Sequence, residues 1–295
     1  MDKADVTIQR HACWLEYNGT AYHGSQFQRR DADRHPTIEG ELRRACAALH
    51  LPLTGAITLA GRTDAGVHAL GQVAHMSAPA EAVSSIRDLA NALNAHLPAD
   101  ISVREVALNV GMDFHARARA RWRWYRYTLL NRRQRSATAP FNVCLERRAL
   151  DVARMDAAAR YLVGTHAFGS FQAPGSLTQD DQCRVAYAAV WQNEDLINFD
   201  IVAARFLYKM VRNLMGLLIA IGGAGPEDAD RYAPDILLDL LGAPDRTRAA
   251  SLAPCARPEG LSLMAVSYAP DYDLFPHNPL VRRLRETLIK ESVSP

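Results

Sequence analysis

The sequence lacks paired cysteines and a long hydrophobic run. Its five cysteines are scattered over 295 residues and form no Cys-x-x-Cys motif, so neither a disulfide framework nor a cysteine zinc site is indicated. No apolar run typical of a signal peptide stands near the start, and the longest apolar helical stretch, residues 210–221, contains Arg212 and Asn213. Because that stretch is too short to span a bilayer, we expect a soluble protein of the reducing cytoplasm.

Lysine is also scarce. Lys3, Lys209 and Lys290 are the only lysines among 34 basic residues, and the formal net charge is +2. So small a charge does not by itself indicate nucleic-acid binding, but arginine suits bidentate phosphate contacts and stacking better than lysine does. Hydrophobic residues make up 48% of the chain and charged residues 22%, which is the balance of a globular protein that can bury a full core.

Strand-like runs alternate with amphipathic helices along the chain. The first half is predicted to contain helices capped by Thr37 and Ser84, and strands at residues 11–17, 57–60, 71–76 and 101–108. The second half is predicted to contain a helix capped by Asp151, and further elements at residues 183–192, 197–204, 206–221, 234–241 and 263–268. We therefore expect an α+β fold of two similar halves around a shared sheet, divided into residues 1–110, 111–150, 151–270 and a peripheral tail, 271–295.

A glycine-bracketed loop, residues 61–68 (GRTDAGVH), lies between two predicted strands. Glycine permits sharp turns and close approach to a ligand, so Asp64, beside Arg62, is a candidate catalytic carboxylate. Two alternatives stay open: an Asx-turn in which Asp64 caps its own backbone, and a metal site of Asp64, His68 and His75. Neither GxGxxG nor GK[ST] occurs, which excludes a Rossmann or P-loop nucleotide site.

Residues 114–127 (FHARARARWRWYRY) alternate with a period of two. A strand with this pattern would place on one face His115, Arg117, Arg119, Arg121, Arg123, Tyr125 and Tyr127. Guanidinium groups bind the phosphates of an RNA backbone, and an aromatic ring stacks on an unstacked base. The pattern therefore favours an RNA-binding face over the alternative, a solvated strand face with the tryptophans in the core.

The predicted helix at residues 206–221 carries a polar stripe in an apolar background. Arg205, Lys209, Arg212 and Gly216 follow one another at helical spacing. Arg212 stands in the middle of this helix, where it either extends to the solvent at the rim or pairs with a carboxylate in a cleft and holds it ionised.

Several segments together resemble the TruA family of tRNA pseudouridine synthases. The strongest are GRTDAGVHALGQVAHM (61–76), DFHARARARWRWYRY (113–127) and MVRNLMGLL (210–218), with weaker similarity in YNGTAYHG (17–24), FGSFQAPG (168–175) and EGLSLMAVSY (259–268). The resemblance spans residues 14–268 in the family's order. It implies the pseudouridine synthase fold, in which two α/β halves flank a mixed, mostly antiparallel central sheet with a cleft between them. One departure is Ser25, which stands where the family usually has tryptophan.

The resemblance also implies roles for individual residues. Asp64 falls on the catalytic aspartate, Tyr125 on a substrate-contacting tyrosine and Arg212 on the basic residue of the active-site helix. Asp64 would act on the ribose, either as nucleophile at C1′ or by taking the 2′ proton, while Arg212 keeps it anionic. Tyr125 would stack on the flipped uracil and Arg62 would fill the gap it leaves. The tRNA phosphates would contact Arg117, Arg119, Arg121, Arg123 and Lys209.

The implied reaction is an isomerisation, so no cofactor and no metal is expected. The family's target uridines lie in the anticodon stem-loop of tRNA, at positions 38 to 40, and the family enzymes are homodimers with tRNA lying across both subunits. Two other interpretations remain: a non-catalytic RNA-binding protein of the same fold, and a metal-dependent phosphohydrolase that uses Asp64, His68 and His75.

Overall fold

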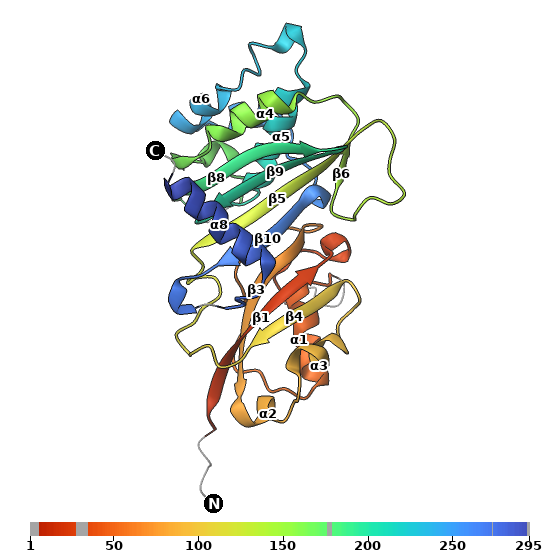
Figure 1. Ribbon diagram of the computed structural model, residues 1–295, viewed down its shortest axis with the longest axis vertical. Helices are drawn as coiled ribbons and strands as arrows, with labels where there is room; N and C mark the ends of the chain where they lie inside the picture. Colours follow the sequence, from red (N-terminus) through yellow and green to blue (C-terminus); the bar gives the residue numbers. More distant parts are fainter. Residues whose placement is uncertain (1–5, 28–34, 176–178, 273, 294–295) are drawn as a thin grey trace, which may run out of the picture. The chain divides into compact units, whose positions relative to one another are not determined.

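The computed structural model describes residues 6–27, 35–175, 179–272 and 274–293, and the chain divides into two compact units (Figure 1). Unit 1 comprises Met1–Arg121 and Leu263–Arg283, and unit 2 comprises Trp122–Ser262 and Leu284–Pro295. The four-part division expected from the sequence stays a prediction.

Unit 1 is built around strand β1, which lies between β4 and β3. Both neighbours run antiparallel to β1, and the register places Leu15 opposite Gln72 of β3 and Val103 of β4. Strand β2 pairs antiparallel with β3, whose other neighbour in the sheet is β10. The strands are β1 (Ile8–Tyr17), β2 (Thr58–Leu59), β3 (His68–Pro79), β4 (Ile101–Ala107) and β10 (Leu261–Ser267).

The helices of unit 1 pack their apolar sides into one core. Thr37 caps α1 as predicted, because its hydroxyl accepts a hydrogen bond from Gly40 N at 3.2 Å. The prediction of one helix capped by Ser84 is wrong. Ser84 ends a short helix, and Asp88 caps the next one by accepting from Asn91 N at 3.0 Å. The helices are α1 (Ile38–Ala48), α2 (Ala80–Ser84) and α3 (Leu89–Asn94), with 3-10 turns at Gly19–Ala21 and Pro270–Tyr272.

Unit 2 contains a second, mostly antiparallel set of strands. Strand β9 lies between β5 and β8 and runs antiparallel to both, β7 extends the set beyond β8, and the short β6 pairs parallel with β5. The prediction of an α+β fold with mixed, mostly antiparallel strands is therefore confirmed. The strands are β5 (Trp122–Asn131), β6 (Cys144–Glu146), β7 (Gly164–Ala167), β8 (Gln182–Asn193) and β9 (Leu196–Ala203).

Helices α4 and α5 of unit 2 pack closely together on the same side of β8 and β9 (Figure 1). A Cβ atom at Gly222 of α5 would lie 2.7 Å from the sulfur of Met155 in α4, so the glycine lets Met155 pack against the helix in its present position. Asp151 caps α4 as predicted by accepting from Arg154 N at 3.0 Å. The helices are α4 (Val152–Arg160), α5 (Met210–Gly223), α6 (Ile236–Gly242) and α7 (Arg246–Leu252), with 3-10 turns at Gly169–Phe171, Pro226–Asp228 and Pro258–Gly260.

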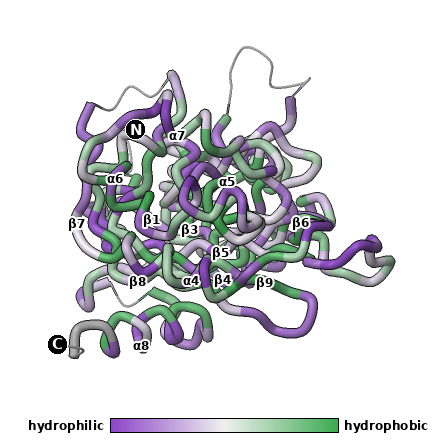
Figure 2. Tube along the Cα trace, turned by 90° about the horizontal axis from the view of Figure 1, so that it is seen from above, coloured by the Kyte–Doolittle hydropathy of each residue, from purple (hydrophilic) through white to green (hydrophobic). Residues whose placement is uncertain are grey.

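The predicted tail contains an ordered helix, α8 (Pro279–Val293). Asn278 is buried and its side-chain oxygen caps the helix by accepting from Leu280 N at 2.8 Å. Hydrophobic and hydrophilic positions alternate along the helix (Figure 2), and Val281 and Leu284 are buried on its apolar side. In the part of the chain that the structure describes, no helix has the length and apolarity needed to cross a bilayer.

A buried carboxylate ties three strands of unit 2 together. Asp200 of β9 is 3% exposed and accepts from the indole N–H groups of Trp124 and Trp191 at 2.7 and 2.8 Å. Arg126 completes the set with two bonds of 2.8 and 2.9 Å, and its guanidinium lies over both indole rings. The carboxylate charge is thus fully compensated by donors.

We predict that Asp200→Asn lowers the free energy of unfolding by about 3 kcal/mol, because it leaves the Arg126 cation without its counter-charge in a buried site. Urea denaturation measures the loss. Asp195→Asn is the matched control: Asp195 is exposed and pairs with Arg132 at 3.1 Å, and an exposed pair contributes less than about 1 kcal/mol. Equal losses in the two variants would contradict the prediction.

Candidate active site

The Asp64 loop, residues 61–67, connects the end of β2 to β3 in unit 1. Its backbone turns where Val67 N donates to Asp64 O at 3.1 Å. Gly66 has a φ of +77° there, a conformation that favours glycine. Thr63 is buried, whereas Asp64 is half-buried and Arg62 and Ala65 are exposed. The loop therefore presents its carboxylate at the surface of a fixed turn.

A buried amide holds the start of this loop. Gln72 of β3 is completely buried, and its side chain pairs with the backbone of Gly61: Nε2 donates to Gly61 O at 2.8 Å and Oε1 accepts from Gly61 N at 3.3 Å. The same Nε2 donates to the phenol oxygen of Tyr17 at 3.2 Å, and that phenol lies 2.9 Å from the hydroxyl of Thr63. Burial raises the pKa of Tyr17 to about 12, so the phenol keeps its proton and can donate it to Thr63.

Ser25, the residue that departs from the family pattern, bonds directly to the residue before Asp64. Its hydroxyl accepts from Thr63 N at 2.9 Å, its own backbone N donates to Thr63 O at 3.1 Å, and it is completely buried. The backbone oxygen of Ser25 in turn accepts from Glu39 N in the first turn of α1 at 3.0 Å. Ser25 therefore links the Asp64 loop to a helix terminus.

The two histidines of the alternative metal site both bond to backbone. His68 Nδ1 accepts from Gly19 N at 3.1 Å, and His75 Nδ1 accepts from Ala116 N at 3.0 Å. Burial, with smaller contributions from Arg10 and His115, lowers the pKa of His75 to about 4, so the ring is neutral at pH 7. Among the described residues, no group of three or more His, Cys, Asp or Glu side chains has an arrangement that could hold a metal ion.

Two predicted site residues of unit 1 come close together. The pKa of Arg117 is lowered, first by its partial burial and then by the positive charge of Arg62. Arg62 stands next to Asp64 in the loop, whereas Arg117 lies in the segment after Phe114. Two guanidinium groups within electrostatic range repel each other, and a bound anion removes that repulsion.

The prediction of one continuous strand over residues 114–127 is wrong in its first half. Strand β5 begins at Trp122, and residues 111–121 follow an irregular path. Arg10 accounts for part of this path, because its guanidinium donates to the carbonyls of Met112 and Phe114, both at 2.6 Å. His115 contributes to the irregular path as well. Its Nδ1 accepts a hydrogen bond from Ala118 N at 3.2 Å, and this bond closes a turn in the chain.

The arginines of that segment consequently differ in their surroundings. Arg119 forms an ion pair of 3.7 Å with Asp113. Arg121 is exposed, and its backbone N donates to Ser267 O at 2.9 Å. Arg123 belongs to β5 in unit 2 and donates to Ala204 O at 2.7 Å. These side chains do not form the row on one strand face that the alternating pattern predicted.

Tyr125 lies in β5, and its ring is 7% exposed. The ring meets that of Phe206 edge to face, with 5.0 Å between centroids and 81° between planes. This contact orients the phenol of Tyr125 within unit 2.

Helix α5 begins later than predicted. Lys209 has a φ of 58° and precedes the first helical residue, so Arg205 and Lys209 do not share a helical stripe with Arg212. Arg212 lies in the first turn, half-buried, and its Nε donates to Ala256 O at 2.8 Å while its own carbonyl accepts from Ala256 N at 3.0 Å. A Cβ at Gly216 would lie 2.0 Å from Pro254 O, so the glycine lets this connection lie against the helix.

Sequence analysis singled out Ser25 only as a departure from the family pattern, and it missed the part that Tyr17, Ser25 and Gln72 play in fixing the loop. Gln72 carried a usable signal, since it is a polar side chain inside a run of apolar residues that β3 buries almost completely. A buried polar group requires hydrogen-bond partners, and the loop eleven residues earlier supplies them. The assigned roles of Asp64, Arg212 and Tyr125 stay predictions.

Comparisons with known proteins agree with the motifs. A family model described as tRNA pseudouridine synthase matches residues 14–117 and 158–269. A tRNA pseudouridine synthase A of Moorella thermoacetica is 42% identical over 258 residues, covering 86% of this chain and 97% of that protein. The protein of the same name from Coxiella burnetii is 37% identical over 274 residues, covering 92% and 98%. These matches cover most of the chain's length, and the chain belongs to the TruA family of tRNA pseudouridine synthases, which are isomerases.

Proposed function

We propose that this protein isomerises uridine to pseudouridine in tRNA and that Asp64 is the catalytic carboxylate. The observation that carries the proposal is the Asp64 loop, where a half-exposed carboxylate follows Gly61 and Thr63, both of which are buried and hydrogen-bonded. A catalytic group must be held in a fixed geometry by its neighbours. The loop lies inside the segment that the family model matches.

The reaction needs only one carboxylate. The N1–C1′ bond of uridine breaks, the uracil rotates, and a C5–C1′ bond forms. Cleavage of a glycosidic bond develops positive charge on the sugar, which a nearby carboxylate stabilises or traps. An isomerase must retain the base and keep water out, so no second carboxylate is needed to activate water. Asp64 acts either as nucleophile at C1′ or as the base that takes the 2′ proton.

Arg212 and Tyr125 of unit 2 complete the proposed site. Arg212 would pair with the Asp64 carboxylate and keep it anionic, while its Nε stays on Ala256 O. Tyr125 would stack on the extruded uracil, and its contact with Phe206 holds the ring in a defined orientation. Arg62 would occupy the space that the flipped base leaves.

The arginines would hold the tRNA backbone. Arg62 precedes Asp64 by two residues and lies within electrostatic range of Arg117, and both would contact tRNA phosphates. Arg119, Arg121, Arg123 and Lys209 would contribute further positive charge along the substrate. We propose the anticodon stem-loop as the target region, a homodimer as the working assembly and the cytoplasm, where tRNA is found, as the compartment.

We predict that Asp64→Asn reduces the rate of pseudouridine formation by about 10³-fold or more, because it removes the group that acts on the ribose. The measurement is nucleoside analysis of a tRNA transcript after incubation with the protein, with and without a chelator, which should not change the yield. Binding of tRNA should stay within about twofold of the unmodified protein. Asp88→Asn, which preserves the cap of α3, serves as the control.

Turnover retained by Asp64→Asn would remove Asp64 from its role. No pseudouridine from the unmodified protein, together with tight tRNA binding, would instead support a non-catalytic RNA-binding protein. A chelator-sensitive release of phosphate would support the phosphohydrolase.

We predict that Ser25→Ala lowers kcat about tenfold and leaves KM within about twofold, because Thr63 N then loses its buried acceptor and the turn that carries Asp64 loosens. Steady-state kinetics on tRNA measure both constants. The matched control is Thr128→Val, which removes a buried hydroxyl that donates to Asn198 at 3.0 Å in unit 2. An equal fall of kcat in the two variants would attribute the effect to general destabilisation.

We predict that Arg117→Gln weakens tRNA binding and makes it less dependent on salt. Loss of one phosphate contact reduces the slope of log Kobs against log salt by about 0.7 to 0.9. Titrations between about 50 and 200 mM salt measure the slope. Arg87→Gln removes the same charge from an exposed position between α2 and α3 and should leave the slope unchanged. If the slope changes equally in both variants, Arg117 contributes only to the overall positive charge of the protein and does not contact a particular phosphate.

A further inference from the structure

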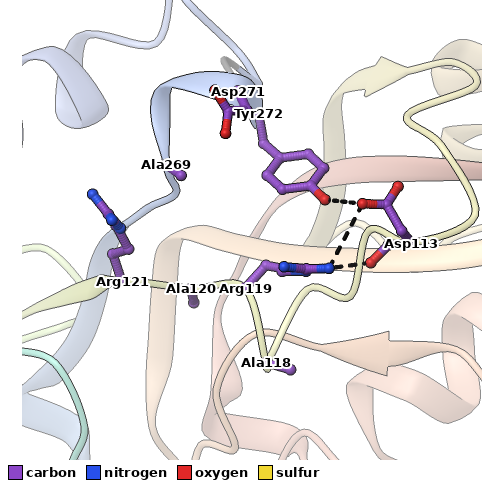
Figure 3. A pocket seen from close by; sticks show the side chains of 8 residues that line it. All are labelled: Asp113, Ala118, Arg119, Ala120, Arg121, Ala269, Asp271 and Tyr272. Carbon is purple, nitrogen blue, oxygen red and sulfur yellow. Dashed lines mark hydrogen bonds and ion pairs between the residues drawn. The ribbon is translucent and has the colours of Figure 1, made fainter.

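Unit 1 contains a cavity of about 650 Å³ outside the Asp64 loop (Figure 3). It lies between the irregular segment before β5 and the 3-10 turn that follows β10. The residues that line it are Asp113, Ala118, Arg119, Ala120, Arg121, Ala269, Asp271 and Tyr272. The volume falls within the range of small-molecule sites in proteins.

An aromatic ring in a fixed position forms one wall of this cavity. The phenol of Tyr272 donates to the carboxylate of Asp113 (Figure 3), and the ring packs on that of Phe114 with 5.3 Å between centroids. This hydrogen bond lowers the pKa of Asp113 and raises that of Tyr272, so the carboxylate stays charged and the phenol stays protonated. The ring is therefore held at its hydroxyl end and by a neighbouring ring.

Arg119 contacts both residues of this wall, Asp113 and Tyr272. Its Nη2 lies 3.7 Å from the Asp113 carboxylate, its Nε donates to Asp113 O at 3.4 Å, and its guanidinium carbon is 5.8 Å from the centre of the Tyr272 ring. The charges of Arg119 and Asp113 largely cancel. Arg119 therefore acts as a positioning residue for the ring, and its part in binding phosphate is secondary.

Arg121 differs from Arg119. Figure 3 shows its guanidinium apart from the cluster of Asp113, Arg119 and Tyr272. Within the described ranges of the chain, no hydrogen bond or ion pair of this guanidinium is found, while its backbone N is anchored on Ser267 O. A cation on an anchored backbone next to an oriented ring is the combination that binds a nucleotide of single-stranded RNA.

We propose that this cavity binds one unpaired nucleotide of the tRNA substrate, away from the uridine that reacts. The phosphate contacts Arg121 and the base stacks on Tyr272. The proposal rests on the proposed function, since it assumes that tRNA is the substrate. Asp271 also lines the cavity, and its carboxylate opposes a phosphate. Removing the charge of Arg121 and removing the charge of Asp271 should therefore change the affinity for tRNA in opposite directions.

Steady-state kinetics on an intact tRNA test the proposal. We expect Arg121→Gln and Tyr272→Leu each to raise KM at least fivefold with kcat unchanged, because the contacts act on binding and not on the reacting ribose. Tyr272→Phe keeps the ring and should raise KM less than Tyr272→Leu does. Asp271→Asn should lower KM. Arg87→Gln is the control for the loss of one exposed positive charge.

Each outcome separates this proposal from the proposed function. If the unmodified protein makes pseudouridine but Arg121→Gln and Tyr272→Leu have the KM of Arg87→Gln, the cavity does not bind the substrate. A fall of kcat at constant KM would also overturn the assignment. If no pseudouridine forms at all, the proposed function fails, and binding of a short single-stranded RNA by the same variants still tests the cavity.

Binding of uridine 5′-monophosphate tests whether the cavity is occupied by part of an RNA strand or by a free nucleotide. We expect calorimetry to show the same weak binding, or none, for the unmodified protein and Arg121→Gln, because one nucleotide lacks the neighbouring contacts that tRNA provides. A Kd for uridine 5′-monophosphate that Arg121→Gln weakens, together with a KM for tRNA that Arg121→Gln leaves unchanged, would assign the cavity to free nucleotides and overturn the proposal.

Discussion

The side-chain amide of Gln72 pairs with both backbone groups of Gly61 in the way a neighbouring strand would, and the placement of the Asp64 loop depends on this pairing. A loop at a protein surface is ordinarily its most mobile part. Here the amide, the Tyr17 phenol and the Ser25 hydroxyl fix the two residues next to Arg62 from inside the core. All three groups are buried, so losing one partner leaves another polar group without compensation. Buried hydrogen bonds from three side chains thus orient the backbone that carries one carboxylate, that of Asp64.

The arginines of unit 1 differ in what surrounds their positive charge. Arg119 is neutralised by Asp113 and orients an aromatic ring, whereas Arg62 and Arg117 repel each other. Repulsion between like charges lowers stability unless an anion is bound. Two arginines within electrostatic range of each other suit a polyanionic substrate. This agrees with the family to which the chain belongs and explains how a net charge of only +2 is compatible with RNA binding.

Periodicity and capping predicted the regular elements well and the irregular ones poorly. Thr37 and Asp151 cap α1 and α4 where their sequence signals place them. The alternation over residues 114–127 also suggested a strand, but Arg10 and His115 take up the backbone groups of its first half. The bonds of Arg10 join residues 102 and 104 positions apart, which no local pattern encodes. The bond of His115 is local and competes with the strand for the backbone. The prediction of where α5 begins was also wrong. Lys209 adopts a left-handed backbone conformation, which helical spacing in the sequence does not reveal.

Ser25 stands where the family resemblance leads one to expect tryptophan, and its hydroxyl makes a bond that an indole does not make. An indole offers only a donor, so it cannot accept from Thr63 N as the serine hydroxyl does. The backbone bond from Ser25 N to Thr63 O needs no particular side chain. The serine side chain therefore adds a second hydrogen bond to the backbone of the same residue, Thr63. The turn before Asp64 is held in this chain by these two hydrogen bonds to Thr63, which the serine hydroxyl and the serine backbone each supply once.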